Sequence, residues 1–464
     1  MSADSARFRR LTSTDLMFLR LESTAWPAHF GGLAVLEGAA LLDDTGKLRL
    51  GEIRDRLDRR VAHVPTMRQR ILRPGFLGGR PLWVDDQEFD IRDHVHERVA
   101  RSPGGDAELL EGAAAVYGGL LDRSRPLWEL WFLTGLSEGR VGVLLKLHHA
   151  VADGLAAVAV MASLFDFEPD APDPDPVAPV REPLPGSWSL VVDNVSSKMH
   201  AVRRAARAVA HPTQLVKRVR TFTHVARRSF GNQAAPGNSL NQPVRAGRRV
   251  QSLRLDLASM KDVAHAHQGK VNDVVLDLWS GGLRRLLTSR AEPVAGVELM
   301  TALPVSLRSP TGTTTVDNQV GTMVLPLPIS EADPRRRLEM IVATTRKVKE
   351  EQRPAAIMGF LAALAATPIG RSFATRQRST NVLVTNVIGP PVPVYLLGAP
   401  VLDVLPIIQL IGNIGLTLCA FSYAGQISLV VTADATAFPD VDELMAGMER
   451  DWHELADSPG PAGP

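Results

Sequence analysis

A change in composition divides the chain near its middle. Residues 166–185 contain seven prolines among Asp and Ala residues. Proline fixes φ and lacks a backbone N–H, so this stretch cannot continue a helix or a central strand. A chain of 464 residues also exceeds what one hydrophobic core usually organises. We therefore expect two domains, at 1–168 and 246–458, joined by a linker and basic arm at 169–245 and followed by a frayed tail at 459–464.

Helical and alternating apolar patterns follow one another in both halves, which predicts the α/β class. Strands are predicted at 29–37, 125–133, 141–148, 250–257, 298–305, 320–327 and 380–387. Helices are predicted within 11–22 and at 50–64, 108–121, 154–165, 260–267, 272–288, 334–352 and 440–455. Residues 416–433 predict a hairpin that turns at Ala424-Gly425.

Composition limits the environment and the partners. The net charge is only +2, so nothing draws the whole molecule to nucleic acid. Cys419 is the single cysteine, which excludes an intramolecular disulfide and favours a reducing compartment. The first ten residues lack the apolar stretch of a secretory signal. The apolar segment 404–421 is interrupted by polar residues, Pro and Gly, which favours buried strands over a membrane span. We therefore expect a cytoplasmic protein.

Two adjacent histidines end the strand predicted at 141–148, in the string His148-His149-Ala150-Val151-Ala152-Asp153-Gly154. Side chains alternate across a strand, so the two imidazoles point to opposite sides wherever the strand continues through them. His149 shares its side with Leu145 and Leu147. The two histidines therefore cannot have the same role.

Histidine is the side chain whose ordinary pKa suits a general base near neutral pH. Asp153 can hold an arginine or the loop backbone, and Gly154 permits a tight turn into the next helix. The alternative for a single histidine is a hydrogen-bonded structural residue. Zinc binding is disfavoured because adjacent strand positions diverge and no HExxH spacing occurs. The chain also lacks GxSxG, GxxxxGK[ST] and GxGxxG motifs, so we expect neither a metal nor a cofactor.

The histidine string resembles the HHxxxDG motif of the wax ester synthase/diacylglycerol acyltransferase family, within the chloramphenicol acetyltransferase and condensation-domain superfamily. Further segments are similar to motifs of that family in the same order. They are the opening segment 11–22, Pro126-Leu127-Trp128 (PLW), Asn272-Asp273 (ND), Asn386-Val387-Ile388-Gly389-Pro390 (NVxGP) and the closing segments 422–425 and 432–434. The resemblance covers the chain except its linker and tail.

The resemblance implies two chloramphenicol acetyltransferase-like domains, each a mixed sheet flanked by helices, with a tunnel at their interface. It implies that long-chain acyl-CoA is the co-substrate and that a lipid hydroxyl, of diacylglycerol or a fatty alcohol, is the acceptor. His149 is expected to deprotonate the hydroxyl, while His148, Asp153 and Gly154 shape the site. The alternatives are an acyltransferase for a polyketide or other secondary-metabolite hydroxyl, and a non-catalytic lipid or acyl-CoA binding protein.

Other motif residues have expected roles beside the histidines. Asn272 is the candidate donor to the substrate or the oxyanion, and its alternative is a helix N-cap. Asp273 is expected to be structural. Arg308 is expected to pair with Asp153 across the domain interface, the alternative being a surface arginine.

The PLW and NVxGP segments have structural interpretations. Pro126, Leu127 and Trp128 are expected to fill the core or to line an apolar tunnel. Asn386 and Gly389 are expected to shape a turn.

The segment 194–230 is predicted to form a basic helical arm. Between Asp193 and Asp256 there is no acidic residue, and basic residues alternate with apolar ones. Because the implied acceptor is insoluble, we expect this arm to contact the inner face of the membrane or lipid bodies peripherally. The alternative is a solvated helix face. The basic residues concerned are Lys198, Arg203, Arg204, Arg207, Lys217, Arg218, Arg220, Arg227 and Arg228.

Overall fold

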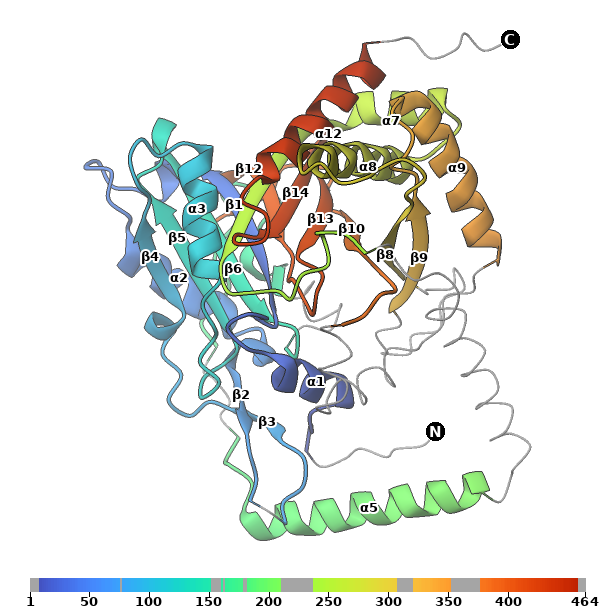
Figure 1. Ribbon diagram of the computed structural model, residues 1–464. Helices are drawn as coiled ribbons and strands as arrows, with labels where there is room; N and C mark the ends of the chain where they lie inside the picture. The colour runs from blue at the N-terminus through green and yellow to red at the C-terminus, as the bar shows by residue number, and fades with distance from the viewer. Residues whose placement is uncertain are drawn as a thin grey trace.

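Two six-stranded sheets and one two-stranded hairpin form the framework of the computed structural model (Figure 1). The sheets are flanked by helices, so the α/β prediction is confirmed. The structure describes residues 8–75, 77–151, 160–161, 163–177, 182–209, 237–306, 320–351 and 376–457. Most of the predicted helix at 154–165 lies outside these ranges, and so does all of the tail at 459–464.

The first sheet has the strand order β11-β12-β1-β6-β5-β4 and is antiparallel except for the β5–β4 pair. β1 has the predicted bounds His29–Glu37, and β6 ends at His148 as predicted. The other strands are β4 (Val95–Val99), β5 (Trp128–Thr134), β6 (Arg140–His148), β11 (Tyr395–Leu396) and β12 (Ala399–Ile407). The helices of this half are α1 (Ser13–Leu21), α2 (Leu50–Val61) and α3 (Asp106–Tyr117), and its hairpin is β2 (Gln69–Leu72) with β3 (Leu82–Asp85).

Two strands, β11 and β12, cross from the second half of the sequence into the first sheet. β12 pairs antiparallel with β1, and Leu33 lies opposite Leu405. The sequence range 246–458 therefore does not correspond to one sheet, because its residues 395–407 complete the N-terminal one. A break in composition marks a linker, but long-range strand pairing decides which sheet a strand joins.

The second sheet has the order β7-β14-β13-β10-β8-β9. Its last hairpin turns at Ala424 and Gly425, which have φ values of 45° and 87°, as predicted from the sequence. The strands are β7 (Arg248–Asp256), β8 (Leu299–Ser306), β9 (Val320–Leu327), β10 (Val382–Ile388), β13 (Leu416–Tyr423) and β14 (Gln426–Asp434). The helices are α7 (Leu257–Ala266), α8 (Val271–Ser289), α9 (Pro334–Glu351) and α12 (Val441–Ala456). Trp279 of α8 is fully buried within the core of this half.

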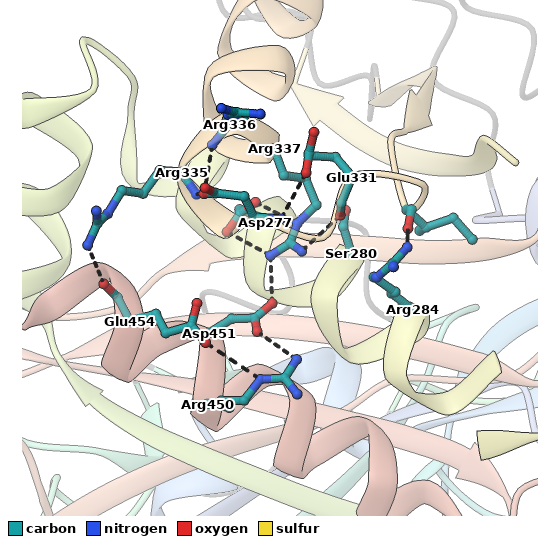
Figure 2. A network of polar contacts seen from close by, with 12 residues as sticks. Asp277, Ser280, Arg284, Glu331, Arg335, Arg336, Arg337, Arg450, Asp451 and Glu454 are labelled. Atoms are coloured by element: carbon teal, nitrogen blue, oxygen red, sulfur yellow. Dashed lines mark hydrogen bonds and ion pairs between the residues drawn. The ribbon is translucent and has the colours of Figure 1, made fainter. Parts of the chain in front are cut away.

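A buried ion network fixes α8, α9 and α12 to one another (Figure 2). The guanidinium of Arg337 on α9 donates to Asp277 of α8 at 2.8 and 3.2 Å, and to Asp451 of α12 at 2.6 Å. All three side chains are shielded from solvent. Gly281 allows this approach, because a Cβ atom there would overlap the Asp451 carboxylate.

The two halves meet along β12. Asp403 of β12 is buried, and its carboxylate accepts hydrogen bonds from Arg254 of β7 at 2.6 Å and from Ser428 of β14 at 2.8 Å. Apolar residues beside it continue the contact, with Val250 and Val430 of the second sheet packed in one cluster with residues of β1 and β12. Polar and apolar contacts together join the sheets.

Part of the basic stretch forms α5 (Ser187–Val209), the long helix at the bottom of Figure 1. Leu190 packs against the β2–β3 hairpin, and Asp193 pairs with Arg10 at 2.7 Å. Residues 210–230 of the predicted arm lie outside the described residues. Among the helices that the structure describes, none combines the length and the apolar character needed to cross a bilayer.

Candidate active site

The histidine pair lies at the end of β6, in the middle of the first sheet. The backbone N–H of His148 donates to the carbonyl of Leu127, next to β5, at 3.1 Å. The N–H of His149 donates to the carbonyl of Ala28, just before β1, at 2.9 Å. Both neighbouring strands therefore fix the backbone of the pair.

His148 is fully buried, and its contacts define its tautomer. The N–H of Ala150 donates to Nδ1 at 3.0 Å, so Nδ1 bears a lone pair and the proton is on Nε2. Nε2 lies 3.4 Å from Oε1 of Glu22. His148 thus links the loop after β6 to α1.

Glu22 follows the last residue of α1 and is buried beside His148. Its carboxylate also accepts hydrogen bonds from Arg123, at 2.8 and 2.5 Å, and from the N–H of Ala28 at 3.2 Å. Burial alone raises the pKa of this carboxyl, but His148 and Arg123 outweigh burial and lower it to about 2. Glu22 is therefore a carboxylate at neutral pH.

His149 has different surroundings. Its ring stacks on Phe18 of α1, with centroids 4.8 Å apart and an interplanar angle of 17°, and it also contacts Phe30 at 5.5 Å and 59°. The imidazole accepts and donates no hydrogen bond among the described residues, and the residue is partly exposed. Burial of the ring, with a smaller contribution from His148, lowers the pKa of His149 to about 4. The ring is therefore neutral at pH 7, and one of its nitrogens keeps a lone pair.

A buried polar layer lies beside His148 on the first sheet. His29, opposite His148 in the β1–β6 register, lies 2.7 Å from the Tyr117 carbonyl through Nε2. Lys146 donates to the Gly119 carbonyl at 2.9 Å and pairs with Glu129 at 3.0 Å. These contacts give the Lys146 ammonium and Nε2 of His29 a partner each, while Nδ1 of His29 has no partner among the described residues.

Helix α1 also reaches the second half of the chain. Met17 and Leu21 pack in one cluster with Val244 and Leu410. The residues that contact the histidines are therefore held at the junction between the two halves.

The second half contributes the ND segment at the start of α8. Lys270 is the N-cap of this helix, so the capping alternative for Asn272 is wrong. Asn272 is half-buried, and its amide makes no hydrogen bond with other described residues. Asp273 is buried and bonded to the Lys270 N–H at 2.8 Å and to the Thr345 hydroxyl at 2.8 Å. Asp273 therefore holds the helix terminus in place.

The PLW segment belongs to the core of the first half. Pro126 and Leu127 are buried, and Trp128 donates from Nε1 to the Met67 carbonyl at 2.7 Å and stacks on His94. These contacts give the segment a packing role.

The NVxGP segment differs from its prediction. Asn386 lies inside β10 with an exposed side chain, so its predicted place in a turn is wrong; the ladder with β13 continues past it to Ile388. Gly389 follows the strand, and a Cβ atom there would lie 2.5 Å from the Phe421 ring. Only glycine fits this close approach.

Three predicted residues, Asp153, Gly154 and Arg308, lie outside the described residues. Phe18, Glu22 and Arg123 are contacts that the sequence did not predict. Glu22 had a detectable signal, because an acid at a helix C-terminus opposes the helix dipole and therefore needs a specific partner. No group of three or more His, Cys, Asp or Glu residues in the described part of the chain is placed to hold a metal ion.

The fold places the chain in a known class. The starter condensation domain of rhizomide synthetase RzmA, solved with C8-CoA, has a similar fold, with a TM-score of 0.55 and 13% identity over 97% of this chain and 95% of that domain. The chain therefore shares the fold of this condensation domain: two mixed sheets, the first completed by strands from the second half of the sequence, with the histidine pair at the end of a central strand.

The chain belongs to the wax ester synthase/diacylglycerol acyltransferase family and is an acyltransferase. The catalytic domain of this family matches residues 11–275, more than half of the chain, and its C-terminal domain matches residues 316–456. The predicted family resemblance is confirmed.

Individual relatives agree with this assignment. The probable diacylglycerol O-acyltransferase tgs1 of Mycobacterium tuberculosis is 29% identical over 457 residues, covering 95% of this chain and 94% of the relative. The solved wax ester synthase/diacylglycerol acyltransferase from Marinobacter aquaeolei VT8 has a TM-score of 0.72 and 23% identity, covering 97% of this chain and 100% of that chain.

Proposed function

We propose that the protein transfers a fatty acyl group from long-chain acyl-CoA to a lipid hydroxyl, with His149 as the general base. The acceptor is diacylglycerol, a fatty alcohol or both. The observation that carries this proposal is the neutral imidazole of His149, which has no hydrogen-bond partner among the described residues and lies at the junction of the two halves. The names of the family and of tgs1 support the class of substrate.

The reaction needs no covalent enzyme intermediate. His149 accepts the proton of the acceptor hydroxyl while its oxygen attacks the thioester carbonyl. The tetrahedral intermediate then expels the coenzyme A thiolate, and the imidazolium returns its proton to that sulfur. A pKa of about 4 makes His149 a weak base, so proton transfer has to accompany the attack rather than precede it.

The proposed supporting residues come from both halves. The amide of Asn272, which makes no hydrogen bond with other described residues, is proposed to donate to the oxyanion, a role worth about 3 kcal/mol. His148 supports the loop, and Asp153 and Gly154 shape it, with Arg308 as the proposed partner of Asp153. Acyl-CoA enters as a co-substrate, and the reaction requires no metal or cofactor.

We also propose that the basic arm, residues 194–230, contacts a membrane or lipid droplet peripherally. On α5 the residues Trp188, Val192, Val195 and Met199 recur at helical spacing and are 77, 52, 50 and 51% exposed. Leu190 and Asp193 face the protein body instead. The exposed apolar residues can insert into a lipid surface, and the segment beyond Asp193 has basic but no acidic residues, which favours anionic lipid.

The lipid contact is tested by flotation with vesicles that contain anionic lipid. Neutralising Arg203, Arg204, Arg207, Lys217 and Arg218, or replacing Trp188 and Val195 with Ser, is expected to reduce vesicle binding. Met340→Ser, a change of an exposed apolar residue on α9, is the matched control. Unchanged binding in both sets of variants contradicts the proposed contact.

The activity is tested with purified protein and radiolabelled palmitoyl-CoA, offered diacylglycerol, hexadecanol or no acceptor. His149→Ala is expected to lower turnover by about 10²–10⁴-fold, the usual range for loss of a general base. His265→Ala, an exposed histidine on α7, is the control. Absence of ester with every acceptor refutes the lipid substrate, and full turnover by His149→Ala refutes the role of the base.

A further inference from the structure

Helix α1 contacts both histidines through two side chains that lie one helical turn apart. Phe18 stacks on His149, and Glu22 lies against His148. We propose that α1 positions the histidine pair, with Phe18 orienting the His149 ring and Glu22 holding His148 and the loop after it. Both are positioning residues, and the inference rests on the proposed role of His149 as the general base.

The His149 ring needs a group that orients it. A catalytic base is usually held by a third group that bonds to its second ring nitrogen, but no described residue bonds to this imidazole. Its aromatic contacts among the described residues are the parallel Phe18 ring at 4.8 Å and the tilted Phe30 ring at 5.5 Å. Stacking against Phe18 restricts rotation of the ring and shields that face from water.

Glu22 acts on the backbone around His149 rather than on its ring. The N–H of Ala150 donates to Nδ1 of His148, which requires His148 to keep its proton on Nε2. That nitrogen faces the Glu22 carboxylate, whose charge is offset by Arg123. The His148 imidazole therefore holds the backbone of Ala150, on the other side of His149, and Glu22 orients that imidazole.

The charged and titratable groups around the pair come from several elements. Glu22 follows α1, Arg123 precedes β5, His29 lies on β1, and Lys146 lies on β6. Phe18 carries no charge, so replacing it changes the hydration of His149 without changing the charges around it. This makes Phe18 the cleaner site for a pH measurement.

The first experiment compares Phe18→Leu with Phe18→Tyr. Leucine removes the ring and admits water, so the pKa of His149 is expected to rise toward its ordinary value of about 6.5. Activity requires neutral His149, so the acid limb of kcat/KM should move from below pH 5 in the wild type to near pH 6 in Phe18→Leu. Phe18→Tyr keeps the stacked ring and should keep the wild-type profile.

The second experiment measures kcat and KM for Glu22→Gln. Loss of the carboxylate should lower kcat by about 10-fold or more, in the range known for residues that orient a functional side chain, while KM for palmitoyl-CoA stays within about twofold. Glu52→Gln, at an exposed position on α2, is the control. Thermal unfolding identifies misfolded variants. If Phe18→Leu misfolds, Phe18→Met replaces it and should shift the acid limb in the same direction. If Glu22→Gln misfolds, Glu22→Asp replaces it and should lower kcat.

The outcomes separate the two hypotheses. The positioning role alone is overturned if the folded Phe18 and Glu22 variants keep the wild-type kcat and pH profile while His149→Ala is inactive. Full turnover by His149→Ala overturns the proposed function itself. Two results together support the positioning role. The acid limb shifts in Phe18→Leu but not in Phe18→Tyr, and Glu22→Gln loses kcat without a change in KM.

Discussion

Gly281 on α8 lies directly against the carboxylate of Asp451 on α12, so that a Cβ atom at position 281 would overlap Oδ2. The same Cβ would lie 2.9 Å from a guanidinium nitrogen of Arg337. The close packing of α8 and α12 therefore depends on the absence of a side chain at this position.

Gly281→Ala is expected to destabilise the protein despite the higher helix propensity of alanine. Overpacking of this kind costs about 1–3 kcal/mol, and displacing Asp451 also weakens its bond to Arg337. Gly51→Ala on α2 is the control, because nothing lies within 4 Å of its Cβ position, and helix propensity predicts a gain of up to about 1 kcal/mol. Thermal unfolding of the two variants should shift in opposite directions.

Arg337→Met is expected to lower stability by about 3–5 kcal/mol, since it leaves the Asp277 carboxylate buried without its cation and leaves Asp451 with only the exposed Arg450. Asp277 and Asp451 lose the partner that Figure 2 shows between them. Arg335→Met removes an exposed arginine of the same helix and should change stability by less than about 0.5 kcal/mol. Equal denaturant midpoints for the two variants contradict a stabilising role of the buried network.

Local sequence patterns predict most of the elements but not all of their pairings. β1 and β9 have the predicted bounds, because each is a short run rich in apolar residues. The hairpin strands β2 and β3 and the strand β4 are not predicted, since each has only four or five residues. The place of β12 beside β1 depends on contacts between opposite ends of the chain, which no local pattern encodes.

The candidate site is predictable only in part for a similar reason. The motif identifies His148 and His149, and strand alternation predicts that they differ. Phe18 fits the apolar periodicity of α1, so nothing in the sequence distinguishes a ring that stacks on His149 from one that fills the core. Arg123 lies in a loop, and its partner Glu22 is far away in sequence.

Asp403→Ala is expected to weaken the junction between the two sheets by about 2 kcal/mol. The variant leaves the Ser428 hydroxyl buried without its acceptor and removes the partner of Arg254, and an unsatisfied buried group costs about 1–3 kcal/mol. Asp442→Ala breaks the pair with Arg249 at a largely exposed position and should cost at most about 1 kcal/mol. Hydrogen exchange should rise in β12 for Asp403→Ala only; equal exchange in both variants contradicts the prediction.

His29 is expected to make the protein lose stability in mild acid. Burial, with a smaller contribution from Lys146, lowers the pKa of His29 to about 3. The Tyr117 carbonyl can only accept, so Nε2 of His29 carries the proton, and Nδ1 has no partner among the described residues. The folded pKa is below the ordinary value of about 6.5, so the unfolded chain binds more protons in the interval between them.

The stabilisation from neutral His29 is therefore complete above pH 6.5 and is lost as pH falls toward 3. Between pH 6.5 and 4 the loss should reach roughly 3 kcal/mol. His29→Gln carries its amide N–H as far from the backbone as Nε2, so it can donate to the Tyr117 carbonyl, and it does not titrate. Its unfolding free energy should therefore fall less steeply over this interval. Denaturant titrations at pH 7, 5.5 and 4 measure both slopes. Parallel slopes for the two proteins would show that His29 is not the group that the folded state keeps neutral.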